Sequence, residues 1–99
     1  MKIPNEYKIA THQYQLIKEE PIKNNTKVKK IKALYKELGM SNYEVLIIRE
    51  NLNLKSIING KEVTFKPYKM PSNEDFGRYG WHYVTLSKAE DKYASIMTL

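Results

Sequence analysis

The sequence has no cysteine among its 99 residues. Disulfide bonds and thiolate zinc sites are therefore excluded as supports of the fold. Long apolar runs are lacking too: the longest is Val45 to Ile48, whereas a membrane-spanning helix needs roughly 20 apolar residues. The start, from Met1 to Glu6, has no apolar stretch of the kind that a secretory signal contains. We therefore expect a cytoplasmic protein with no membrane segment.

Groups suited to catalysis are also few. His12 and His82 are the only histidines, and neither stands at metal-ligand spacing from another histidine or from a cluster of carboxylates. The acidic pairs Glu74-Asp75 and Glu90-Asp91 are adjacent in sequence, so on a strand or helix they would not converge as an acid and a base. No Gly-rich phosphate loop, nucleophile elbow or metalloprotease motif occurs. These absences predict a protein that is not an enzyme and needs no metal or cofactor.

Positive charge is in excess. The chain has 17 basic residues against 11 acidic ones, which gives a net charge of +6. Such an excess favours an anionic partner, above all nucleic acid. Arginine is scarce, since Arg49 and Arg78 are the only two, and specific readers of bases and phosphates favour Arg for its planar fork. The alternative is that the Lys, Asn and Ile bias comes from an AT-rich genome and that part of the basicity has no function.

The first half of the chain predicts an extended segment, a helix and a strand. Residues 7–17 read as extended, with a bulge or tight bend near 11–13, where the hydrophobic phase slips. Residues 26–38 match a helix, capped by residues 24–26 and ended by Gly39. The expected apolar stripe of that helix is Val28, Ile31, Leu34, Tyr35 and Leu38. Residues 43–50 carry apolar side chains at both parities, which is typical of a central strand.

The second half predicts strands and a closing helix. Asn59-Gly60 joins strands at 54–58 and 62–66 in a hairpin whose Val63 and Phe65 would face the core. A strand at 79–87 follows an irregular loop, and Ser87 with Glu90 forms a capping box for the last helix. Its expected inward stripe is Ala89, Tyr93, Ile96 and Met97. The predicted fold is one small α+β domain over residues 1–99, an antiparallel sheet of about four to five strands with two helices, in the order β-α-β-β-β-β-α.

Three regions are candidates for binding. Lys29, Lys32 and Lys36 would line the polar side of the expected first helix, where they could meet phosphates or form an ordinary solvated face. Tyr79, Trp81 and Tyr83 share one side of the aromatic strand and could stack on bases, although Trp is more often buried, so we assign Trp81 to the core. The loop at 70–78 holds Phe76 beside Arg78; it is either a contact loop or a plain surface excursion.

Two partial resemblances bear on these candidates. The tail, with Ser87, Lys88, Lys92 and Ala94, is similar to the end of a double-stranded-RNA-binding domain, and this resemblance implies that Lys88 and Lys92 meet phosphates across a groove. The chain departs from that family at Asp91, at Ala89 and in having one strand too many. Residues 34–41 and 58–61 resemble the two ends of a helix-turn-helix repressor, but residues 45–48 and 51–53 between them favour a strand and a turn.

The sequence thus predicts a small basic binding protein without catalysis, which engages nucleic acid or a nucleic-acid-bound complex. Composition and size suggest a phage or mobile element as its source. The alternative is a protein–protein inhibitor or adaptor, for example a phage product that blocks a host defence or nucleic-acid-processing complex. Self-association into a homodimer through an exposed strand edge stays open. The predicted contact residues are Lys29, Lys32, Lys36, Phe76, Arg78, Tyr79, Tyr83, Lys88 and Lys92.

Overall fold

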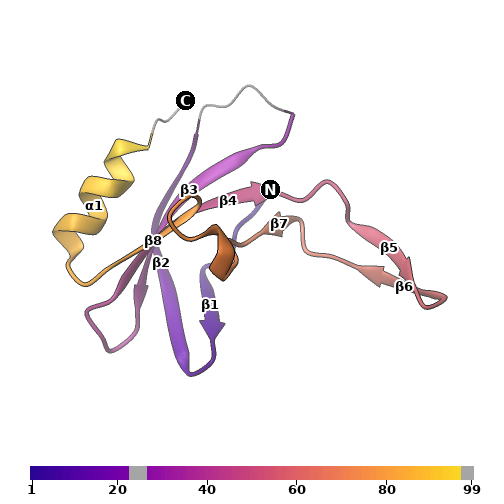
Figure 1. The fold of residues 1–99 in the computed structure, drawn as a ribbon, viewed down its shortest axis with the longest axis horizontal. Helices are drawn as coiled ribbons and strands as arrows, with labels where there is room; N and C mark the ends of the chain where they lie inside the picture. Colours follow the sequence, from indigo (N-terminus) through magenta and orange to yellow (C-terminus); the bar gives the residue numbers. More distant parts are fainter. Residues whose placement is uncertain (23–26, 97–99) are drawn as a thin grey trace.

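A computed structural model describes residues 1–22 and 27–96 of the protein. Within these residues, six strands form an antiparallel sheet in the order β1-β2-β3-β4, with β7 and β8 both paired to β4 (Figure 1). The strands are β1 (Glu6–Ile9), β2 (His12–Pro21), β3 (Lys30–Glu37), β4 (Tyr43–Glu50), β7 (Tyr68–Lys69) and β8 (Gly80–Tyr83). A separate hairpin pairs β5 (Lys55–Ile58) with β6 (Lys61–Thr64), and the short 3-10 helix η1 (Asn73–Asp75) precedes β8. The chain closes with α1 (Leu86–Ser95).

The predicted α+β class is confirmed, but the first helix is wrong. The part of residues 26–38 that the structure describes contains β3, and α1 is the only α-helix among the described residues. The expected caps at residues 24–26 lie outside the described residues. The misleading feature is that Leu34 and Tyr35 are consecutive and both fully buried, on opposite faces of the strand. A strand that is covered on both sides has apolar residues at consecutive positions. A short run of apolar residues of this kind can match the spacing of a helix as well.

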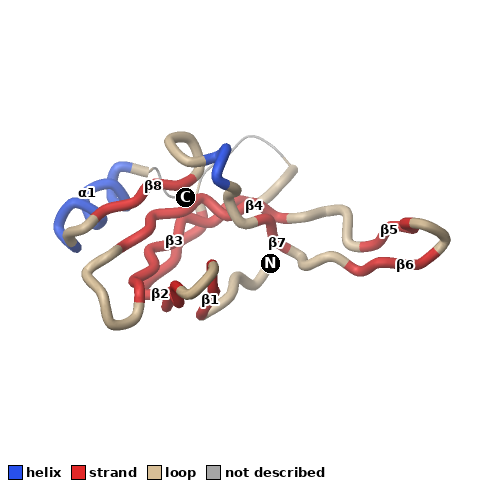
Figure 2. Tube along the Cα trace, turned by 60° about the horizontal axis from the view of Figure 1, so that its bottom comes forward, coloured by secondary structure: helices blue, strands red, loops and turns tan. Residues whose placement is uncertain are grey.

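Each face of the sheet carries its own apolar core. On one face α1 packs through Ala89 and Tyr93 against Leu34 and Val45, with Trp81, Tyr83 and other half-buried residues around them. Figure 2 shows α1 lying beside β8. We call this the α1 face. On the opposite face, the N-terminal segment brings Ile3 against Tyr14, Ala33, Tyr35, Leu46 and Ile48. The Tyr35 hydroxyl donates a hydrogen bond to the Pro4 carbonyl at 2.7 Å, which ties the N-terminal segment to β3.

The predicted hairpin at Asn59-Gly60 is confirmed, but its position is not the expected one. Both turn residues have positive φ angles, 52° and 76°, as this tight turn requires. The hairpin projects away from the main sheet (Figures 1 and 2), so Val63 and Phe65 face no shared core, although both are half-buried. We call residues 51–67 the arm.

The ends of the molecule differ in detail from the expectation. The phase slip near 11–13 is a tight bend between β1 and β2, with Ala10 at φ 53°, and a register shift follows between Leu16 and Lys18. The last helix begins before Ser87: its N-cap is Thr85, whose hydroxyl accepts a hydrogen bond from the Lys88 N–H at 3.4 Å. Met97 lies outside the described residues. No helix in residues 1–22 and 27–96 is long and apolar enough to cross a bilayer.

Candidate nucleic-acid interface

A row of three cations crosses adjacent strands on the α1 face. Lys30 of β3 lies directly opposite Arg49 of β4, and Arg49 lies directly opposite Lys69 of β7. Side chains in directly opposite positions project to the same face with Cβ atoms roughly 5 Å apart, and like charges placed there repel each other. The Asp75 carboxylate offsets part of this repulsion, since its Oδ2 lies 3.4 Å from Arg49 Nη2, and a further anion against the row would offset more of it.

Tyr79 lies beside this row. Its carbonyl accepts a hydrogen bond from the Ile47 N–H at 2.8 Å, which holds the residue against β4. The guanidinium carbon of Arg49 lies 4.4 Å from the centre of the Tyr79 ring. The corresponding distances are 5.2 Å for the Arg78 guanidinium carbon and 6.0 Å for Lys30 Nζ. One aromatic ring therefore attracts three cations, which keeps their charges close together.

A hollow of about 290 Å³ opens among these side chains. Its lining consists of Val28, Lys30, Arg49, Glu50, Lys69 and Tyr79. We call these residues, together with Arg78, the cation cleft. Four of them are cationic. Two carboxylates lie against them: that of Glu50, which also accepts a 3.4 Å hydrogen bond from the Lys29 N–H, and that of Asp75, which contacts Arg49. The cleft is thus a site of net positive charge.

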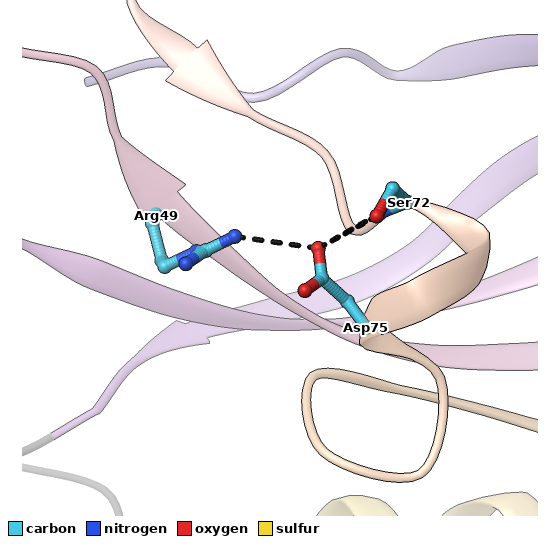
Figure 3. Close-up of polar contacts among 3 residues, drawn as sticks. All are labelled: Arg49, Ser72 and Asp75. Atoms are coloured by element: carbon cyan, nitrogen blue, oxygen red, sulfur yellow. Dashed lines mark hydrogen bonds and ion pairs between the residues drawn. The ribbon is translucent and has the colours of Figure 1, made fainter.

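A short loop holds one of the arginines in place (Figure 3). Arg49 Nη2 donates to Asp75 Oδ2 at 3.4 Å, and the same oxygen accepts hydrogen bonds from the Ser72 N–H at 3.0 Å and the Ser72 hydroxyl at 3.2 Å. The Ser72 backbone N–H lowers the pKa of Asp75 most, with the Ser72 hydroxyl and the charges of Arg49 and Arg78 adding to it. Arg49 Nε is buried and has no hydrogen-bond partner among the described residues. Arg49 is therefore positioned without using all of its donors.

The three lysines expected on one helix face are separated by the strand that replaces that helix. Lys32 is buried beneath α1, where Nζ donates hydrogen bonds to the carbonyls of Tyr93 at 2.8 Å and Ile96 at 2.9 Å. Lys36 is exposed further along the same face of β3, and Lys29 is exposed just before the strand. Lys32 therefore serves the end of α1, while its neighbour Lys30, which the sequence did not single out, belongs to the cleft.

The other predicted contact residues are divided between surfaces. Arg78 and Tyr79 belong to the cation cleft, whereas Phe76 packs over Gly80 on the opposite face, where a Cβ on that glycine would come within 2.9 Å of the ring. Tyr83 is half-buried under α1. Lys92 Nζ lies 4.0 Å from the centre of the Trp81 ring, so its charge is already engaged. Lys88 is exposed on α1.

A second concave region lies on the face opposite α1. Two hollows of about 480 Å³ and 360 Å³ adjoin there, and they share the lining residues Ile9, Glu44, Pro71 and Phe76. Tyr7, Leu46, Tyr68 and Met70 also line the first hollow, and His12 and Tyr14 line the second. We call the two together the tyrosine groove. Glu44 in its lining is only 6% exposed.

One histidine near the groove is paired with a carboxylate. His12 Nδ1 lies 2.6 Å from Glu37 Oε2, and Asn42 Nδ2 donates to the other Glu37 oxygen at 2.8 Å. These hydrogen bonds, that from Asn42 first, lower the pKa of Glu37. The sequence did not predict the pair, because the two residues come together only across β2 and β3. Among the described residues, no three His, Cys, Asp or Glu side chains are grouped to hold a metal ion.

Sequence reasoning missed the central members of both concave regions. Lys30, Arg49 and Lys69 become neighbours only through strand pairing, and Glu44 was assigned to a strand but not to a site. Comparison of the chain with protein-family models, curated proteins and solved structures gave no match. We therefore infer function from the geometry of the two faces.

Proposed function

We propose that the protein binds the phosphate backbone of nucleic acid through the cation cleft, without catalysing a reaction. The observation that carries this proposal is the row of Lys30, Arg49 and Lys69 across three neighbouring strands. A phosphate placed against the row would convert mutual repulsion into attraction. Arg49 supports the same conclusion, because its side chain stays 30% exposed although it is paired with Asp75.

The arm favours a long polyanion over a single phosphate. It leaves the sheet directly after β4 and returns directly before β7. Its two ends therefore join two of the three strands that carry the row. Lys55 and Lys61 along it are both exposed. A two-stranded ribbon has dimensions that fit the major groove of duplex DNA. A backbone held in the cleft could therefore continue along the arm and meet further lysines.

Salt dependence tests this proposal. A fluorescently labelled 20-nucleotide probe, single-stranded or duplex, should bind at about 50 mM salt and weaken steeply as salt rises, since each neutralised phosphate adds about 0.7–0.9 to the slope of the log–log plot. The double variant Lys30→Glu/Lys69→Glu should weaken binding tenfold or more and lower the slope by about 2. Circular dichroism would verify that the variant is folded.

The matched control is Lys36→Glu/Lys88→Glu, which changes the net charge equally but outside the cleft, at two exposed lysines. Its affinity should stay within about threefold of the parent protein. Equal weakening by both double variants would show that only overall charge matters, and no binding of either probe at low salt would overturn the proposal.

The arm also favours a second candidate, a protein–protein inhibitor or adaptor. Leu54, Ile58, Val63 and Phe65 share one side of the hairpin by its register, and Leu54 and Ile58 are 44% and 49% exposed. An isolated two-stranded hairpin is marginal in water, and an exposed apolar side of this kind is what a protein interface covers. Capture of a host protein that survives nuclease treatment and is lost on Leu54→Ser/Ile58→Ser would favour this candidate, and the oligomeric mass of the free protein would reveal a homodimer.

A further inference from the structure

The tyrosine groove contains a buried acid without a cationic partner. Glu44 lines both hollows and is 6% exposed, and no ion pair to it occurs among the described residues. Burial raises the pKa of its carboxyl, while the hydroxyls of Tyr14 and Tyr7 and the charge of His82 act in the opposite direction and Glu37 adds to the rise. A buried carboxylate of this kind is stabilised most by a cation with hydrogen-bond donors.

A second polar group, the Tyr7 hydroxyl, lies beside Glu44. The Tyr7 hydroxyl is buried and makes no hydrogen bond of standard geometry with the described residues, although it lies close enough to Glu44 to affect its pKa. The Tyr7 ring is fixed, because it stacks on Tyr14 with centres 5.0 Å apart and meets Tyr35 edge-on at 4.7 Å. The carboxyl and the hydroxyl therefore form a preorganised pair of acceptors.

We propose that the tyrosine groove binds an organic ammonium group, with Glu44 as its counter-ion. The N–H donors of an ammonium group fit the carboxylate and the oxygen of the Tyr7 hydroxyl, whereas an anion would be repelled by Glu44. A metal ion fits less well, because no group of ligating side chains suited to one occurs in the part of the chain that the structure describes.

The aromatic wall supports a cation. Tyr68, Tyr79, Trp81 and Tyr93 each have a Lys or Arg of this chain within 6.0 Å of the ring centre. Phe76 has no such cation among the described residues, although it lines both hollows and is 38% exposed. Its ring could therefore contact an ammonium group or the methylene next to it. The Phe76 ring thus offers an ammonium ion the same kind of aromatic contact that lysines and arginines of this chain make elsewhere in the molecule.

The rim and walls define the remainder of the ligand. Glu6, Lys8 and Lys66 at the rim are exposed, so water and salt screen their charges far more than that of Glu44. Between rim and floor the walls are apolar, with Ile9, Leu46 and Met70. We therefore expect the ammonium group to be carried on an unbranched alkyl chain. A free alkylamine and the lysine side chain of a peptide share this chemistry.

Three probes test the inference by calorimetry and by amide chemical shifts: hexylamine, hexanoate, and the blocked peptide acetyl-Gly-Lys-Gly-amide. At least one amine probe should bind and shift the amides of Glu44 and Phe76, whereas hexanoate should not. Binding by the peptide alone would identify a protein lysine as the source, and binding by hexylamine alone a small amine. Failure of both amines, or equal binding of hexanoate, would overturn the inference.

Two variants localise the site. Glu44→Gln keeps the shape of the side chain and should weaken amine binding tenfold or more. Glu62→Gln, at an exposed glutamate of the arm that lines neither hollow, should change it less than twofold. If Glu44→Gln is poorly folded, Phe76→Leu provides an independent test, because loss of the ring should weaken amine binding about threefold or more. Unchanged affinity in both Glu44→Gln and Phe76→Leu would contradict the assignment. Lys30→Glu/Lys69→Glu should leave amine binding intact, so this inference and the nucleic-acid proposal can fail separately.

Discussion

On the two central strands, β3 and β4, the two faces of the sheet carry charges of opposite sign. On β3 and β4 the α1 face carries Lys30, Lys32, Lys36 and Arg49, whereas Glu37 and Glu44 lie on the opposite face with Tyr35. Successive residues of a strand point to opposite faces. When the basic residues of a strand occupy one set of alternate positions and the acidic residues the other, the strand therefore carries opposite charges on its two faces. The net charge of +6 hides this separation. A basic protein can therefore have one face suited to anions and another suited to cations.

The faces also differ in how their charges are accommodated. On the α1 face, the buried Lys32 is paired with helix carbonyls, and the cations of the cleft lie beyond the end of α1. On the opposite face, which contains the tyrosine groove and which we call the groove face, Glu37 is paired with His12 and Asn42. Glu44 is buried there and has no ion-pair partner among the described residues. In each case one charge is paired within the fold, and we have proposed that another binds a ligand.

The largest effect should come from the core beneath α1. Leu34 is fully buried and holds α1 against the sheet, so Leu34→Ala should lower the free energy of unfolding by about 2–5 kcal/mol. Leu52→Ala in the arm, where the side chain is 64% exposed, should change it by less than about 0.5 kcal/mol. Urea denaturation measures both. A small loss for Leu34→Ala would show that α1 contributes little to the stability of its face.

The second prediction concerns the buried lysine. Lys32→Met keeps most of the volume but removes both hydrogen bonds to the C-terminal carbonyls of α1, and it should lower the free energy of unfolding by about 1–3 kcal/mol. Lys36→Met is the matched control, since Lys36 lies on the same face of β3 but is exposed. Chemical denaturation followed by helical circular dichroism compares the two. Equal stabilities would show that Lys32 does not support α1.

The two glutamates of the groove face should respond to pH with opposite signs. The pKa of Glu37 lies below its ordinary 4.5 in the folded state, so its contribution is present above that value and is lost as pH falls through the folded pKa. Burial raises the pKa of Glu44, so its ionisation weakens the fold as pH rises from 4.5 through the folded pKa. Near neutral pH, Glu44→Gln should therefore stabilise the protein by about 1 kcal/mol or less, and Glu37→Gln should destabilise it.

Carboxyl NMR titration measures both groups directly. Glu37 should titrate below 4.5 and Glu44 above it. The reverse order, or a Glu44→Gln variant less stable than the parent protein at neutral pH, would mean that Glu44 is satisfied within the fold. Such a result would also remove the reason for expecting a cationic ligand.

The accuracy of sequence reasoning depended on whether the signal was local. Asn59-Gly60 defined its turn through φ angles that few other residues adopt, and the run from Val45 to Ile48 marked a strand buried on both sides. For residues 30–37 the local signal was ambiguous, because Leu34 and Tyr35 are buried on opposite faces. The position of the arm was beyond prediction, since a hairpin pattern does not say which surface lies beneath it.

The candidate sites were less predictable than the fold. Arg78 and Tyr79 are adjacent in the sequence and were singled out, but their partners Lys30 and Arg49 reach them only through the pairing of β3, β4 and the segment before β8. The alternation of side chains along β4 could by itself have assigned Glu44 to one face of the sheet. Its burial depends on the β1–β2 hairpin and the loop after β7, which cover that face from distant parts of the chain.

The smallest expected effect tests whether surface ion pairs help to hold α1 on its face. Lys18 Nζ lies 3.7 Å from Glu90 Oε1, with the two side chains 42% and 48% exposed, and also 4.8 Å from the centre of the Tyr93 ring. An exposed ion pair contributes little, so Glu90→Gln should change the free energy of unfolding by less than about 0.5 kcal/mol. Lys18→Gln also removes the contact with the ring and should cost slightly more, up to about 1 kcal/mol. A loss for Glu90→Gln as large as that for Lys32→Met would mean that the exposed ion pair holds α1 as strongly as the hydrogen bonds of the buried lysine do.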